Sequence, residues 1–154
     1  MNLSVKAVKF HDDMSQETAC FSAKLCLDGK EVGQVSNDGN GGPHRYAWKD
    51  NALGCRIDDW AQTQPTEFEF EKLDQVVDRL LARVEATQRL AKFMKEGTVF
   101  LLNGDNPANW RLIKRPFNQE TANRLRQQYG DTLRLIANEN PDRAVDVTLE
   151  SPNI

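Results

Sequence analysis

The residues best suited to chemistry gather in one glycine-rich stretch, Asn-Asp-Gly-Asn-Gly-Gly-Pro-His-Arg, at positions 37–45. Its glycines permit backbone conformations that other residues avoid, so successive amide groups can converge on an anion. The histidine and arginine that follow suit a phosphate or a carboxylate, and two aromatic residues come next. We predict a shaped loop that contacts a protein partner or a small anionic ligand. The candidate residues are Asn37, Asp38, Gly39, Gly41, Gly42, His44, Arg45, Tyr46 and Trp48.

The same stretch also fits a connection that needs glycine only to turn. Its spacing matches neither G-x-G-x-x-G nor G-x-x-x-x-G-K-[ST], and no strong helix signal follows directly. Asn37 and Asp38 can accept hydrogen bonds from their own backbone, which would hold the loop in shape. A competing hypothesis is an enzyme for a phosphate-containing or nucleic-acid substrate, with His44, Asp38 and Arg45 as its site. Because no second titratable cluster at a readable spacing supports it, the sequence favours a non-enzymatic function with no catalytic residue.

Two other groups have the right atoms for metal or thiol chemistry. His11, Asp12 and Asp13 are suitable donors, but three consecutive residues seldom point at one ion. The three cysteines (Cys20, Cys26 and Cys55) include no C-x-x-C pair, which argues against a zinc site and a disulfide frame. We expect buried or half-buried free thiols, no metal and no cofactor.

A basic segment in the second half of the chain mixes aromatic residues with cations, a combination that can contact nucleic acid. The same pattern fits a strand and a helix with aromatics inward and cations outward. The formal charge of −3 argues against broad nucleic-acid affinity. The possible contact residues are Trp110, Arg111, Lys114, Arg115, Arg124 and Arg126.

Size and composition set the frame for these sites. The chain has 154 residues, 39% hydrophobic and 28% charged, which suits one folded domain spanning residues 1–154. No apolar run approaches a membrane span, and the N-terminal stretch lacks the apolar core of a secretion signal. We therefore expect a cytoplasmic protein without membrane contact.

Hydrophobic periodicity predicts the elements that position the loop. Asp28-Gly29 supplies the positive φ angles of a two-residue turn, so residues 20–36 form a hairpin in which Leu25 faces Val32 and Ser22 faces Val35. An apolar stripe predicts a long helix over residues 71–96, which can cover a sheet or form a homo-oligomer interface. Further helices are predicted at 54–63 and 118–129, and further strands at 3–10 (with a bulge at 7–8), 45–49, 98–103, 110–114, 132–137 and 144–149.

The segment before the long helix is left open. Thr66 and Glu69 can form a capping box there. Phe68 and Phe70 fit either the helix or a short strand.

The stretch "FSAKLCLDGKEVGQVSNDGNGGPHRY" resembles the opening half of small uncharacterised proteins of bacteria, phages and mobile elements. These proteins share a strand, a D/N-G turn, a second strand and an N-D-G-x-G-G loop followed by an aromatic strand. The resemblance covers residues 17–50 and brings no catalytic residues with it. It implies an accessory role, such as that of an interaction or inhibitor protein.

Together these patterns predict an α+β fold. An antiparallel sheet is built around the hairpin at residues 20–36 and is covered by the long helix. A second strand–helix–strand unit completes the domain.

Overall fold

The computed structural model describes residues 1–150 and has the predicted α+β fold, with two antiparallel sheets. The chain divides into two compact units, residues 1–81 and residues 82–154, where the sequence suggested a single domain. The boundary falls inside the long helix α2 (Lys72–Glu96).

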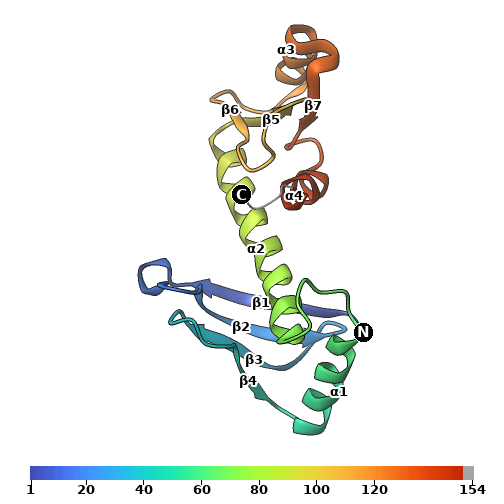
Figure 1. Cartoon of the computed structure of the whole chain (residues 1–154). Coiled ribbons are helices and arrows are strands. Elements are labelled where there is room, and N and C mark those ends of the chain that lie inside the picture. The colour runs from blue at the N-terminus through green and yellow to red at the C-terminus, as the bar shows by residue number, and fades with distance from the viewer. Residues whose placement is uncertain (151–154) are drawn as a thin grey trace. The chain divides into compact units, whose positions relative to one another are not determined.

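The first unit contains a four-stranded antiparallel sheet whose strands follow chain order (Figure 1). After β4 the chain enters α1 and, beyond an irregular segment, the first part of α2. The elements are β1 (Leu3–Phe10), a 3₁₀ turn (Asp12–Met14), β2 (Cys20–Leu27), β3 (Lys30–Asp38), β4 (Arg45–Trp48) and α1 (Asn51–Gln62).

The predicted hairpin is present, but its register differs from the prediction. Asp28 and Gly29 have φ values of 51° and 84°, as the two-residue turn requires. A bulge then shifts the pairing, so that Leu25 lies opposite Gly33 and Ser22 opposite Ser36. The turn fixes the pairing only next to it, at Leu27 and Cys26, and the extra residue beyond it brings the apolar side chains of Ala23 and Val35 opposite each other. The predicted bulge in β1 is confirmed by a register shift between Lys6 and Lys9.

The first part of the predicted long helix covers the sheet of the first unit, together with Ile57 and Ala61 of α1, whereas Ala86 and Leu90 of the same helix belong to a separate core. Leu73, Val77 and Leu81 of α2 are buried in one core with Phe21 and Leu25 of the sheet. This helix begins at Lys72, immediately after Glu71, whose φ is 50°. The expected capping box is absent, because the Thr66 hydroxyl instead donates to the carbonyl of Phe68.

The second unit has a three-stranded antiparallel sheet with β5 (Thr98–Leu102) between β6 (Arg111–Ile113) and β7 (Leu133–Ile136). All five residues of β5 are buried. Between β6 and β7, α3 (Gln119–Tyr129) is capped by Asn118 and ends at Gly130, as the sequence predicted, and a 3₁₀ turn (Gly130–Thr132) leads into β7. The unit also contains α4 (Pro141–Leu149).

The strand predicted at residues 144–149 is wrong, since those residues belong to α4. Asn140 caps this helix by accepting from the amide of Arg143, and Pro141 occupies its first turn. Ala144, Val145 and Val147 are buried within the helix, and their near-alternation mimicked a strand. The Asn-Pro start signal was the better guide, because proline suits the first helical turn.

Candidate functional site

The glycine-rich loop of the first unit is ordered by one buried side chain, Asn37, which is 4% exposed. Its Oδ1 accepts from the hydroxyl of Thr18 at 2.9 Å and from the amide of Gly39 at 2.8 Å. Its Nδ2 donates to the carbonyl of Gly42 at 2.9 Å. The side-chain amide of Asn37 therefore links both ends of the loop to the segment before β2. The predicted hydrogen bond from the loop backbone to Asn37 is confirmed.

The loop does not offer the anion cradle that we predicted from its glycines. The amide of Gly39 donates to Asn37, that of Asn40 to Asp38 Oδ1 at 3.3 Å, and that of Gly41 to Thr18 Oγ1 at 3.3 Å. These successive donors have partners inside the protein, so they do not converge on an external anion.

Two of the loop glycines are required by the close packing of the chain. Gly39 and Gly41 have φ values of 84° and 89°. A Cβ on Gly39 would lie 2.7 Å from the carbonyl oxygen of Met14. A Cβ on Gly42 would meet nothing within 4 Å. Glycine therefore serves the shape of this loop at positions 39 and 41.

His44 attaches the loop to the first turns of α2. Its amide donates to Asp74 Oδ2 at 2.8 Å, and its Nε2 lies 2.7 Å from Asp78 Oδ1. Its Nδ1 lies 3.1 Å from Asn37 Nδ2, so the neutral ring accepts there and donates from Nε2 to Asp78. With its side chain 9% exposed and both nitrogens engaged, this histidine holds structure together, and no ring nitrogen is free to act as a base.

The charges around His44 favour its protonated form. Burial by itself lowers the pKa of the imidazole, but the hydrogen bond and charge of Asp78, with the charges of Asp74 and Glu71, raise it overall. The Asn37 amide works in the opposite direction, because it donates to the nitrogen that would take the proton. The net rise therefore depends on the carboxylates of α2 and the residue before it.

The two aromatic residues of β4 are fixed side by side. The rings of Tyr46 and Trp48 stack with centroids 5.5 Å apart and planes 4° from parallel. The Tyr46 hydroxyl donates to Asp74, and burial, followed by that hydrogen bond, raises the pKa of the phenol, which stays protonated. Trp48 leaves no room for a side chain at Gly54, where a Cβ would lie 2.6 Å from the indole. Arg45, in contrast, pairs with Asp38 at 3.0 Å in an exposed position.

An exposed aromatic pair next to this loop was not among the site residues predicted from the sequence. Phe68 and Phe70 are 50% and 64% exposed, lie in neither helix nor strand, and stack with centroids 5.4 Å apart. Gln75 holds their segment: its Oε1 accepts from the amide of Phe68, and its Nε2 donates to the carbonyls of both phenylalanines. The available signal was the run Phe-Glu-Phe-Glu before an amphipathic helix, where apolar residues fall outside the helix stripe.

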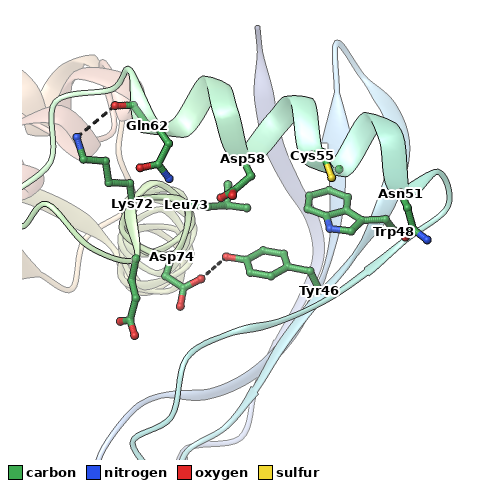
Figure 2. Close-up of a pocket in the computed structure, with 11 residues that line it drawn as sticks. Tyr46, Trp48, Asn51, Cys55, Asp58, Gln62, Lys72, Leu73 and Asp74 are labelled. Carbon is green, nitrogen blue, oxygen red and sulfur yellow. Dashed lines mark hydrogen bonds between the residues drawn. The ribbon is translucent and has the colours of Figure 1, made fainter.

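Two cavities open around these residues. The first, here called the aromatic groove, is about 470 Å³ and lies between the glycine-rich loop and the Phe68–Phe70 pair, with three carboxylates on its wall. The second, here called the tyrosine–tryptophan pocket, is about 600 Å³ and lies between β4, α1 and the start of α2 (Figure 2). Glu71 and Asp74 line both, so the two cavities are neighbours.

The basic segment, which the sequence offered only as a possible nucleic-acid contact, forms most of its interactions within the second unit. The Trp110 indole donates to Thr148 Oγ1 at 3.0 Å and packs against the core, which leaves it unsuited to stacking on a base. Ion pairs engage three of its arginines with Asp105, Glu120 and Glu139. Lys114 and Arg115 form no ion pair within the described residues.

Two further features bear on the class of site. In residues 1–150, no group of three or more His, Cys, Asp or Glu side chains is arranged to hold a metal ion. Among the helices of the same residues, none is both long and apolar enough to cross a membrane. Cys20 and Cys26 are buried as free thiols, whereas Cys55 is exposed, contrary to the expectation that each thiol is buried or half-buried.

No family model matches this chain, and neither the curated proteins nor the solved structures include one with significant similarity to it.

Proposed function

We propose that the first unit is a non-enzymatic protein-binding module whose aromatic groove receives a segment of a partner protein. The observation that carries this proposal is the Phe68–Phe70 pair, whose rings are stacked and exposed. Its backbone is fixed by three hydrogen bonds to the Gln75 side chain, which donates two and accepts one. Aromatic side chains that are already ordered give contact area at a low entropic cost, which is the usual character of a binding hot spot.

The charge of the groove defines the chemistry of the partner. Its wall carries Glu71, Asp74 and Asp78, and its lining includes no lysine or arginine. The first unit as a whole has 14 acidic and nine basic residues, a net charge of −5, whereas the second unit has nine and eleven, a net charge of +2. The negative electrostatic potential of this unit attracts a partner segment with basic and apolar side chains and opposes the binding of a small anionic ligand.

The geometry gives little support to the competing enzyme hypothesis. Its proposed site needs His44 free to move a proton and Arg45 free to hold a phosphate. Both ring nitrogens of His44 are engaged, and Arg45 pairs with Asp38. In a binding protein, His44 and Arg45 need only hold the loop in place. Such a function also fits the accessory or inhibitor role that the resemblance to phage and mobile-element proteins implies.

The test is a selection of random peptides on the purified protein, followed by titration of the selected peptides by fluorescence anisotropy. We expect peptides rich in basic and apolar residues. The double variant F68S/F70S should weaken their binding by about a hundredfold or more, because truncating central aromatic anchors typically costs 2 kcal/mol or more each.

The matched control is F117S, which removes an exposed phenylalanine, 39% exposed, from the second unit. It should leave peptide binding unchanged. Selection of no peptide, or equal binding by F68S/F70S and the unaltered protein, would contradict the proposal.

A further inference from the structure

The tyrosine–tryptophan pocket holds an uncompensated negative charge beside two aromatic rings. Asp58 and Glu71 line it, and neither carboxylate forms a hydrogen bond or an ion pair with another residue of the described chain. Asp74, the third carboxylate of its lining, accepts from the Tyr46 hydroxyl and the His44 amide. Figure 2 shows the Asp58 side chain directed from α1 toward the side of the pocket where Tyr46 lies.

The single cation in the lining does not neutralise these carboxylates. Lys72 is largely covered, with its side chain 12% exposed. Its Nζ donates to the carbonyl of Gln62 at 3.2 Å and lies 3.3 Å from Glu69 Oε2, which is outside the pocket lining. The lysine is thus directed away from Asp58 and Glu71, and the lining keeps a net charge of −2.

From this arrangement we infer that the tyrosine–tryptophan pocket binds the guanidinium group of an arginine side chain belonging to the partner segment. A planar guanidinium can stack on an aromatic ring while it donates two parallel hydrogen bonds to a carboxylate. The rings of Tyr46 and Trp48 supply the stacking surface, and Asp58 with Glu71 supplies the acceptors. The volume of about 600 Å³ is ample for one arginine side chain.

The inference rests on the proposed function, because it treats the pocket as a continuation of the aromatic groove. Glu71 and Asp74 line both cavities, so a segment lying on Phe68 and Phe70 can extend an arginine past Glu71 into the pocket. The groove then selects apolar residues, and the pocket selects one arginine.

Cys55 provides a direct measurement of pocket occupancy. It is the exposed cysteine of the chain and lines the pocket, whereas Cys20 and Cys26 are buried. The rate at which iodoacetamide alkylates Cys55, followed by mass spectrometry of the intact protein, therefore reports whether the pocket is filled. The probe is N-acetyl-arginine amide, and its neutral isostere N-acetyl-citrulline amide is the matched ligand control.

We expect the arginine amide to slow alkylation of Cys55 severalfold at concentrations on the order of millimolar, the range for one anchored side chain. The citrulline amide should give no protection. The variant D58N/E71Q should remove protection by arginine, whereas D59N/E67Q, with the same change in charge outside both cavities, should keep it. Equal effects of the two amides, or no protection by either, would overturn the inference.

A second arm separates this inference from the proposed function. In a selected peptide, replacing the arginine with citrulline should weaken binding to the unaltered protein about tenfold and leave binding to D58N/E71Q unchanged. Peptides that bind through Phe68 and Phe70 but tolerate citrulline would refute the arginine site and leave the protein-binding module standing. If the arginine amide protects Cys55 but no peptide is selected, the arginine site would be supported and the protein-binding module refuted.

Discussion

Two loops of this protein have similar compositions but satisfy their polar groups in different ways. Residues 37–44 span the end of β3 and its connection to β4 and read Asn-Asp-Gly-Asn-Gly-Gly-Pro-His. Residues 103–109 lie between β5 and β6 and read Asn-Gly-Asp-Asn-Pro-Ala-Asn. In the second loop, Asp105 forms a bidentate pair with Arg111 at 2.7 and 3.0 Å and accepts from the amide of Leu102. Its charge is compensated within a few residues.

The first loop is satisfied by groups that are distant in the sequence. Asn37 takes Thr18 as a partner, and His44 takes Asp74 and Asp78. This attachment brings the loop to the acidic start of α2, where more carboxylates gather than there are cations to pair with them. In the second unit, the charge of the loop is thus paired by a residue close in the sequence. In the first unit, the attachment of the loop to α2 leaves unpaired carboxylates around a cavity.

The largest expected effect follows from deleting the centre of the first loop. Asn37→Leu keeps the volume of the side chain but leaves the Thr18 hydroxyl, the Gly39 amide and the Gly42 carbonyl without their partner. We expect the free energy of unfolding to fall by about 4 kcal/mol, since each buried unsatisfied group costs about 1–3 kcal/mol. Denaturant unfolding measures this loss. Asn37→Asp, which retains the shared acceptor, should lose less; an equal loss in both variants would count against the hydrogen bonds.

A smaller effect separates close packing from backbone strain at the two loops. Gly39 and Gly104 have φ values of 84° and 92°, but a Cβ at Gly39 would strike Met14 and one at Gly104 would meet nothing. Gly104→Ala should cost about 1 kcal/mol from left-handed strain alone, and Gly39→Ala about 3 kcal/mol. Thermal unfolding of the two variants compares them. Equal losses would show that the first loop is no more tightly packed than the second.

The smallest effect is a pH dependence of opposite sign in the two loops. His44 has a raised pKa in the folded protein, so its stabilisation is complete below its unfolded value of about 6.5 and is lost as pH rises through the folded value. The Asp105 carboxylate has its pKa lowered to about 2, chiefly by the hydrogen bond from Arg111, so its stabilisation is present above about 3.8 and is lost as pH falls toward 2.

The measurement is urea unfolding of two variants against the unaltered protein at a series of pH values. The destabilisation caused by Asp78→Asn should shrink as pH rises above 6.5. That caused by Asp105→Asn should shrink as pH falls below 4. A difference that stays constant with pH for either variant would show that its charge pair does not contribute in the way described.

The features that the sequence predicted correctly are those decided by near neighbours. Asp28-Gly29 gives its turn because two adjacent residues tolerate positive φ, and Asn118 and Gly130 delimit α3 because caps act within one helical turn. The apolar stripe of α2 is similarly periodic. The strand partner of Leu25 was predicted wrongly because a bulge adds one residue to the hairpin. The α4 helix was predicted as a strand because its buried residues nearly alternate along the sequence.

The sequence predicted which residue types occur at the candidate site, but not which of their polar groups are free to bind a ligand. Residues 37–48 showed glycines, a histidine and aromatics, and these residues do lie around two cavities. Whether the loop amides point outward, and whether Phe68 is exposed, depends on Thr18, Gln75 and Asp74, which lie elsewhere in the sequence. Hydrogen bonds and unpaired charges are properties of atoms brought together by folding, so the tertiary structure alone decided that this surface is acidic and aromatic.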